Sequence, residues 1–150
     1  MLPPVIKTIT VPCPPERAFE VFTRDIDLWW PKDKNSVSAM DGKVAQKVTL
    51  VAQKGGRIEE IDHTGSSQHW GSVTEFAPPN KLGLAWHIGR PESEATFVDV
   101  VFEAAGTGTK VTLKHYGWVA FGEDAEKMRA GYNAGWVGVF ETAFAAACEG

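Results

Sequence analysis

The fold of this protein is decided by one stretch of sequence, residues 123–147, EDAEKMRAGYNAGWVGVFETAFAAA. Its large apolar residues recur at every fourth position, a spacing that places side chains on one face of an α-helix. These residues are Met128, Tyr132, Trp136, Phe140 and Phe144. We therefore expect one long amphipathic helix whose apolar face packs against the rest of the protein.

A line of glycines runs along a second side of the same predicted helix. It consists of Gly131, Gly135 and Gly138. Each glycine in a helix costs about 0.5–1 kcal/mol relative to alanine, so three of them indicate a requirement for space. Two explanations are open: the backbone of a sheet packs closely there, or that side of the helix borders an open cavity.

The sequence before this helix shows strand patterns separated by turn sequences. β-Branched and other apolar residues alternate with polar ones, and the intervening segments contain Gly, Pro, Asn and Ser. Short connections between such strands favour an antiparallel meander. The predicted strands are 5–11, 44–52, 57–62, 67–76, 81–88, 96–103 and 109–118.

Two short helices are expected after the first strand. Prolines at 12, 14 and 15 end that strand, and a helix follows over about 15–23. Asp25 can begin a second helix, and Pro31 ends it by forcing Trp30 out of helical geometry. In the intervening sequence DIDLWWP, the rings of Trp29 and Trp30 would point roughly 100° apart. We expect one ring to pack between the short helices and the sheet, and Trp30 to face a cavity entrance.

The last hairpin has a predictable register. If Phe102 faces Val111, then Val100 faces Leu113 and Val98 faces His115. The opposite face then pairs Asp99 with Lys114 and Glu103 with Lys110, which are opposite charges across strands. A slip by one residue would bury these charges.

Composition limits the possible functions. The chain has 150 residues, consistent with a single domain over 1–150, and a net charge of −4 without a basic patch, which argues against nucleic-acid binding. No apolar run approaches the ~20 residues of a membrane span, and the N-terminal sequence does not resemble a signal peptide. Cys13 and Cys148 are expected to be free thiols in a reducing compartment, so the expected location is the cytoplasm. No cofactor is indicated.

His115 is the most distinctive polar candidate, because the predicted register places it on the apolar face. It is either a core histidine hydrogen-bonded to its neighbours, or a polar contact or acid/base group in a cavity. His63 is expected in a turn, and His69 and His87 on the faces opposite Trp70 and Trp86. No spacing among the four histidines supports a metal site.

The tryptophans come from different predicted elements. Each of Trp70, Trp86, Trp118 and Trp136 could be an ordinary core residue, but together they are also consistent with an aromatic-lined pocket. Ser66, Ser67 and Cys13 lack any neighbouring group that would activate a nucleophile. The loop containing Arg90, Glu92 and Glu94 is either a solvated loop or the rim of a cavity.

Several motifs, in this order, resemble the START-like helix-grip superfamily (SRPBCC), and within it the heat-shock-protein 90 ATPase activator homologue family. They are WWP, GGRIEE, HWGSV, LGLAWH, LKHYGW and YNAGW, and the resemblance extends from about Val5 to Phe144. It implies an α+β fold in which a curved antiparallel sheet wraps around the C-terminal helix and leaves a cavity between them. Only the C-terminal domain of the eukaryotic activator is matched.

The expected function is therefore the binding of a small apolar or aromatic ligand in that cavity. The predicted lining is Trp30, Trp70, Trp86, His115, Trp118, Trp136 and Phe140. Two alternatives are open: a cyclase- or aromatase-like enzyme that uses His115 as acid/base, and a co-chaperone-like domain that contacts a chaperone ATPase. The sequence supplies no obvious second catalytic group beside His115, so binding is favoured over catalysis.

Overall fold

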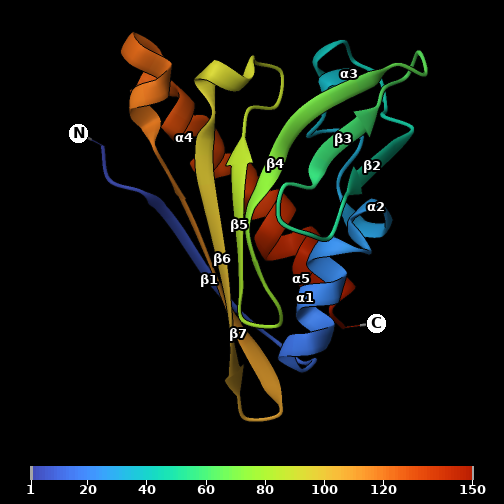
Figure 1. Ribbon diagram of the computed structural model, residues 1–150, viewed down its shortest axis with the longest axis vertical. Helices are drawn as coiled ribbons and strands as arrows, with labels where there is room; N and C mark the ends of the chain where they lie inside the picture. The colour runs from blue at the N-terminus through green and yellow to red at the C-terminus, as the bar shows by residue number, and fades with distance from the viewer. Residues whose placement is uncertain (1, 150) are drawn as a thin grey trace.

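A computed structural model describes residues 2–149 and shows a seven-stranded antiparallel sheet (Figure 1). The strand order is β1-β7-β6-β5-β4-β3-β2, so the meander β2–β7 is closed at one end by the N-terminal strand. The sheet curls into a half-barrel. The strands are β1 Val5–Val11, β2 Lys47–Leu50, β3 Arg57–Ile61, β4 Ser67–Ala77, β5 Lys81–Trp86, β6 Thr96–Ala105 and β7 Gly108–Tyr116.

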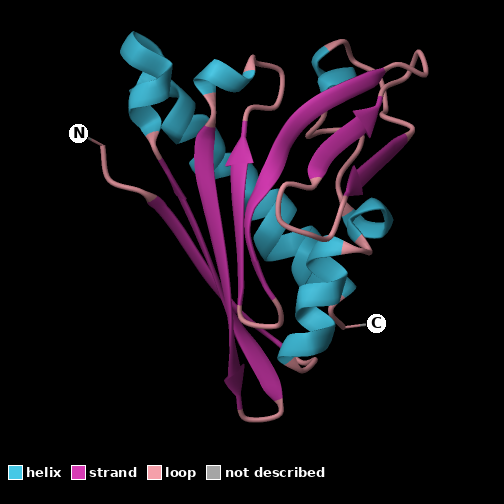
Figure 2. Cartoon of the chain, viewed as in Figure 1, coloured by secondary structure: helices cyan, strands magenta, loops and turns pink. Residues whose placement is uncertain are grey.

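The helices lie before β2 and after β7, with a single 3₁₀ turn between β5 and β6 (Figure 2). The two short helices expected after the first strand are present, and a third, which the sequence did not predict, follows them. The helical segments are α1 Pro15–Thr23, α2 Ile26–Trp29, α3 Val37–Met40, η1 Glu92–Glu94, η2 Trp118–Asp124, α4 Ala125–Trp136, the π-helical η3 Val137–Phe144 and α5 Ala145–Ala147. Among residues 2–149, none of these combines the length and apolar character needed to cross a membrane.

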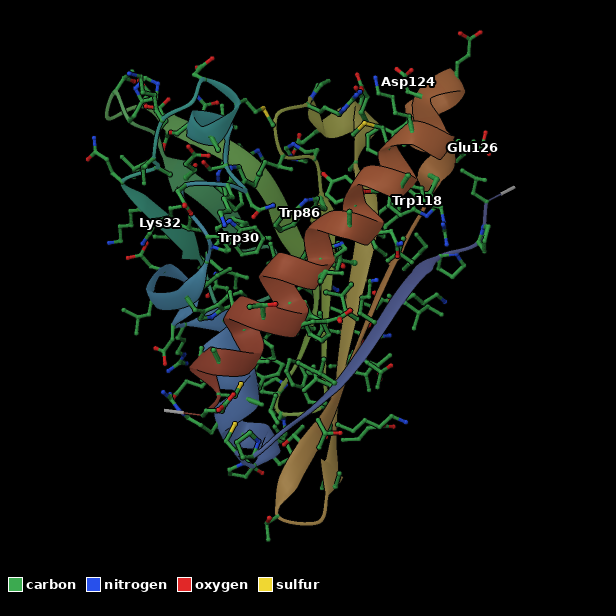
Figure 3. All side chains as sticks on the ribbon, turned by 180° about the vertical axis from the view of Figure 1, so that it is seen from behind. Trp30, Lys32, Trp86, Trp118, Asp124 and Glu126 are labelled. Atoms are coloured by element: carbon green, nitrogen blue, oxygen red, sulfur yellow. The ribbon has the colours of Figure 1, made fainter. Side chains whose placement is uncertain are left out.

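The predicted C-terminal helix is confirmed as one continuous rod. The junction residues Val137 and Ala145 keep right-handed helical dihedral angles, so α4, η3 and α5 run on without a break. The rod crosses the concave side of the sheet diagonally, as Figure 3 shows from behind. Residues 123 and 124, predicted to open the helix, instead end the 3₁₀ segment η2. The fold is therefore the helix-grip α+β arrangement.

The strand registers agree with the hairpin prediction. Val98 pairs with His115, Val100 with Leu113 and Phe102 with Val111. On the other face, Asp99 pairs with Lys114 and Glu103 with Lys110. His115 is fully buried on the helix side of the sheet.

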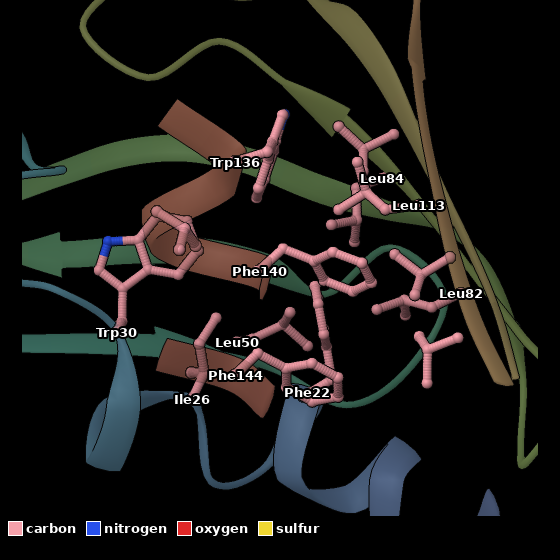
Figure 4. Packing of buried hydrophobic residues seen from close by; sticks show 14 of the residues in the cluster. Phe22, Ile26, Trp30, Leu50, Leu82, Leu84, Leu113, Trp136, Phe140 and Phe144 are labelled. Atoms are coloured by element: carbon pink, nitrogen blue, oxygen red, sulfur yellow. The ribbon is translucent and has the colours of Figure 1, made fainter. Parts of the chain in front are cut away.

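One half of the helix closes the main core. Phe140 and Phe144 are both fully buried and stack with ring centroids 5.6 Å apart (Figure 4). Phe144 also meets Phe22 of α1 at 5.1 Å, which joins the helix to the N-terminal helices. Each buried aromatic side chain of this kind contributes roughly 1.5–3 kcal/mol through removal of apolar surface from water.

The two adjacent tryptophans take different roles, as their expected divergence predicted. Trp29 packs against Phe22 and Phe144, and its indole N–H donates to the Val21 carbonyl at 2.7 Å. Trp30 leaves helical geometry before Pro31, with φ −58° and ψ 131°, and its N–H donates to the Asn35 carbonyl at 2.6 Å. Trp29 therefore belongs to the packed core, whereas Trp30 turns toward the other half of the helix.

Candidate functional site

A cavity lies between the sheet and the first half of the C-terminal helix. Its volume is about 390 Å³, within the size range of sites for small organic ligands. The wall is formed by α4, by the end of β5 and by the segment between α2 and β2. The lining residues are Trp30, Lys34, Asn35, Ser36, Met40, Trp86, Ile88, Lys127, Met128, Gly131, Tyr132, Gly135, Trp136 and Val139.

Three indoles form the aromatic wall of this cavity. Trp30 lies 5.7 Å from Trp86 and 6.3 Å from Trp136 between ring centroids, and Trp86 lies 6.0 Å from Trp136. Figure 3 shows Trp30 and Trp86 on one side of the middle of the helix. The rings come from three separate elements, so each fixes the position of the others. An apolar or aromatic molecule is the natural occupant of such a wall.

The glycines on the helix border open space, which selects the second of the two explanations considered from the sequence. A methyl group built on Gly131 would meet nothing within 4 Å, and one on Gly135 would meet only the Asn35 side-chain nitrogen at 3.9 Å. Both glycines line the cavity. Gly138 also has nothing within 4 Å, but it is not part of the lining.

The segment that forms the outer wall is fastened to the sheet by one buried carboxylate. Glu60 of β3 accepts hydrogen bonds from the backbone N–H groups of Val37 and Ser38 at 2.7 and 3.0 Å, and from the Ser38 hydroxyl at 2.7 Å. The Trp70 indole donates to the same carboxylate at 3.0 Å. Four donors on two oxygens fit the ionised carboxylate, which only accepts. Glu60 thus holds α3 at the cavity.

This anchor was not predicted from the sequence, although the sequence contains a signal for it. Glu60 alternates with Ile58, and both side chains are fully buried on the same face of β3. Strict alternation in RIEEI therefore placed a carboxylate on an apolar face. A buried carboxylate requires hydrogen-bond donors, and the donors come from a helix that the sequence did not predict.

Two polar groups of the wall, the Trp86 indole N–H and the Tyr132 hydroxyl, lie next to each other. Within the described part of the chain, the Trp86 indole nitrogen is buried without a hydrogen bond. Burial raises the pKa of the neighbouring Tyr132 hydroxyl to about 12, so this hydroxyl stays neutral at physiological pH. The side chains of Lys34 and Lys127 add two positive charges at the exposed edge of the cavity.

His115 lies behind this wall in a closed hydrogen-bond chain. The Trp136 indole N–H donates to His115 Nδ1 at 3.0 Å, so the ring proton resides on Nε2 and is donated to Thr96 Oγ1 at 2.7 Å. The Thr96 hydroxyl in turn donates to the Trp86 carbonyl at 3.3 Å. Burial lowers the pKa of His115 to about 3, which keeps the ring neutral. The core-histidine explanation fits this geometry.

The structure divides the seven predicted lining residues into two groups. Trp30, Trp86 and Trp136 lie in the cavity wall. The other four lie outside this wall. Trp70 packs behind Trp30 with ring centroids 5.2 Å apart, and His115 is enclosed by its hydrogen-bond partners. Phe140 is in the packed core, and Trp118 lines a different hollow with Leu2 and Pro4. Alternation along a strand indicates which face of the sheet a side chain lies on. It does not indicate whether other side chains cover it.

The remaining candidates take ordinary positions. Ser66 and Ser67 are exposed, and Cys148 is buried beside Cys13, which raises the pKa of the Cys148 thiol to about 12. Arg90 lines a second hollow that shares Met128 and Tyr132 with the main cavity, so its loop does border the site. His63 is exposed as expected.

His69 and His87 project from the side of the sheet opposite Trp70 and Trp86, but His87 is not exposed. Only 4% of its surface is accessible, because the following loop turns back over the ring. The Arg90 N–H donates to the His87 carbonyl at 2.7 Å, and His87 Nδ1 donates to the Arg90 carbonyl at 2.9 Å. The sequence pattern of alternation contained no information about this loop.

Several solved structures have the same fold and align with nearly the whole length of this chain. The anthrahydroquino-gamma-pyrone synthase Txn09 is 26% identical, with a TM-score of 0.68 and coverage of 97% of each chain. The self-sacrificing resistance protein CalC from Micromonospora echinospora is 24% identical, with a TM-score of 0.67 over 97% of this chain and 94% of CalC. The Aha1 dimer from Colwellia psychrerythraea is 18% identical, with a TM-score of 0.59 and coverage of 89% and 90%.

A comparison with curated protein sequences finds no match. The profile of one protein family, by contrast, matches residues 12–148, which include every element of the fold except the first strand. The chain therefore belongs to the family described as activator of Hsp90 ATPase homolog 1-like protein.

Proposed function

We propose that the protein binds a small aromatic ligand in the cavity beneath helix α4. The observation that carries this proposal is the combination of three indoles with two glycines that leave the opposite side open. A cavity of about 390 Å³ accommodates a molecule of two or three fused rings. The unpartnered Trp86 N–H and the Tyr132 hydroxyl would select a ligand with a carbonyl or hydroxyl oxygen on its ring system.

Two further features support a ligand of this class. The two lysines at the edge favour a ligand that carries a negative charge or a polarised oxygen at its outer end. Txn09, the similar structure at 26% identity, is named as a synthase of an anthrahydroquino-gamma-pyrone, which is a fused aromatic ring system. A related cavity in this chain would suit a related class of molecule.

The same geometry argues against catalysis by His115. A general base must reach the substrate, but both ring nitrogens of His115 are occupied by Trp136 and Thr96. Its low pKa also leaves no imidazolium to act as an acid near neutral pH. We therefore propose a binding protein rather than a cyclase that uses this residue.

The proposal is tested by titrating purified protein with 9,10-anthraquinone-2-sulfonate and following the quenching of tryptophan fluorescence. Two glycine substitutions provide a matched pair. Gly131→Leu places its side chain in the cavity, whereas Gly138→Leu adds the same side chain outside the lining. Both replace a helical glycine and should keep or raise the melting temperature.

We expect one probe molecule per chain, binding at least tenfold weaker to Gly131→Leu and unchanged for Gly138→Leu. A tenfold loss corresponds to about 1.4 kcal/mol of binding free energy. Native mass spectrometry of the freshly purified wild-type protein complements the titration by detecting any ligand that co-purifies. Equal affinity of the two leucine variants, or the absence of both probe binding and a co-purifying molecule, would refute the proposal.

A further inference from the structure

A second cluster of functional groups lies on the outer side of the sheet, away from the cavity. His69 extends from β4, His87 directly follows β5, and Glu92 begins the 3₁₀ turn η1. One ring nitrogen of each histidine and one carboxylate oxygen of Glu92 lie within 4.8 Å of one another. The two imidazole rings are nearly perpendicular, with centroids 4.7 Å apart.

Each histidine is already oriented by a backbone carbonyl. His69 Nε2 is 2.8 Å from the Gly71 carbonyl oxygen, and His87 Nδ1 is 2.9 Å from the Arg90 carbonyl oxygen. A carbonyl only accepts, so these two nitrogens carry the protons. The lone pairs of the neutral rings therefore reside on His69 Nδ1 and His87 Nε2. A carbonyl that holds the far N–H of each imidazole is the usual second-layer arrangement around protein metal ligands.

The backbone beneath the two histidines is rigid. β4 and β5 pair with each other near these residues, and the His87 N–H bonds to the Trp70 carbonyl at 2.7 Å. Glu92 is the exposed and adjustable member, because it lies in a three-residue turn. A tetrahedral metal with bonds of about 2.0–2.1 Å needs its ligand atoms roughly 3.4 Å apart. A rotation of the Glu92 side chain and a small closure of the loop would reach that spacing.

The cationic side chain of this loop, Arg90, is directed elsewhere. The Arg90 guanidinium pairs with Glu94 at 2.5 Å and lies over the Phe121 ring at 4.7 Å. It therefore leaves Glu92 without a competing positive charge from this loop. On the neighbouring strand, Glu59 lies opposite His69 and forms an ion pair with Arg57 at 3.3 Å.

We propose that His69, His87 and Glu92 form a binding site for a divalent transition-metal ion, with an exposed fourth position filled by water. Two imidazoles and one carboxylate favour Zn²⁺, Ni²⁺ or Cu²⁺ over Mg²⁺ or Ca²⁺, which prefer oxygen ligands. The same loop carries Ile88 into the cavity wall and Arg90 to its border. A bound metal would thus fasten the loop at the cavity entrance to the outer side of the sheet.

The test is isothermal titration of tag-free protein with Zn²⁺, combined with thermal unfolding at the same metal concentrations. His69→Gln and Glu92→Gln each remove one ligand at a partly or fully exposed position, so both should fold. His63→Gln is the matched control, because His63 is an exposed histidine outside the cluster. Co²⁺ supplies an independent readout through the visible absorption of its tetrahedral complexes.

We expect one Zn²⁺ per wild-type chain, with affinity at least tenfold lower in His69→Gln and Glu92→Gln and unchanged in His63→Gln. Zn²⁺ should raise the melting temperature of the wild-type protein and of His63→Gln only, since a ligand stabilises the state that binds it. The inference fails if wild-type protein binds no Zn²⁺, or if the two ligand variants bind it as tightly as His63→Gln does.

Discussion

Acidification should destabilise this protein through His115 even at mildly acidic pH. In the folded state the ring is enclosed, and burial lowers its pKa to about 3. In the unfolded chain the same ring has a pKa of about 6.5. Between these two pKa values, the His115 ring therefore binds a proton in the unfolded state but not in the folded state. The stability contributed by this difference is complete above about pH 6.5 and is lost progressively as the pH falls toward 3.

The expected size follows from these two pKa values. Between pH 7 and pH 5, the unfolded chain gains about 0.7 of a proton at this residue and the folded chain gains almost none. The free energy of unfolding should therefore fall by about 2 kcal/mol on account of His115 alone. Such a loss is a large part of the stability of a small domain, which is typically about 5–15 kcal/mol.

The assay is urea unfolding at pH 7 and pH 5 for wild-type protein and His115→Gln. Glutamine can accept from the Trp136 indole and donate to Thr96 as the neutral histidine does, but it does not titrate. The wild-type protein should lose about 2 kcal/mol more than His115→Gln between the two pH values. All other titrating groups are shared and cancel in the comparison.

Two results would contradict this account. One is an equal pH dependence of the two proteins, because the folded and unfolded pKa values of His115 would then coincide. The other is an NMR titration in which the His115 ring of the folded protein protonates near pH 6. Either would mean that water or a solvated cavity reaches the ring, and would return His115 to the list of acid/base candidates.

Three further outcomes follow from the packing. Glu60→Gln replaces one acceptor oxygen of a fully buried carboxylate by a donor. Urea unfolding should therefore show a loss of about 1–3 kcal/mol of unfolding free energy, and binding of the anthraquinone probe should weaken. The control Glu59→Gln, on the same strand, should change neither quantity. Phe140→Ala leaves a void in the core and should cost about 3–5 kcal/mol of unfolding free energy, and an effect below 1 kcal/mol would show that the site collapses freely. The buried Cys148 thiol, with its pKa raised to about 12, should react with a disulfide reagent at pH 8 only after unfolding in urea, and rapid labelling of the native protein at this residue would disagree with its burial.

Much of the fold could be predicted because its determinants are local and periodic. The alternation in β6 and β7, with its two cross-strand charge pairs, left a single register that avoided buried charges, and that register is present. Pro31 placed the end of α2 by excluding the helical conformation at Trp30. These rules act within a strand, a hairpin or one turn of helix, and they do not depend on distant residues.

The candidate site was less predictable because it depends on what lies across the cavity. Alternation placed His115 on the inner face, but only the position of Trp136 on the helix determined that the ring is covered. Trp70 shares the inner face with residues of the wall, yet Trp30 covers it, with the two ring centroids 5.2 Å apart. The approach of His69 to His87 depends on the pairing of β4 with β5 and on the loop after β5, which residue spacing along the chain does not describe.

The C-terminal helix explains how one fold combines a packed core with an open site. Its second half presents Phe140 and Phe144, which stack at 5.6 Å and fill the space beneath the sheet. Its first half carries Gly131 and Gly135 beside the face that holds Tyr132 and Trp136, and the space remains open there. The two adjacent tryptophans lie at the junction of the two halves. Trp30 contacts Trp136 in the first half, and Trp29 contacts Phe144 in the second half. The open half can therefore change its lining, and with it the ligand, without disturbing the aromatic contacts that hold the helix against the sheet.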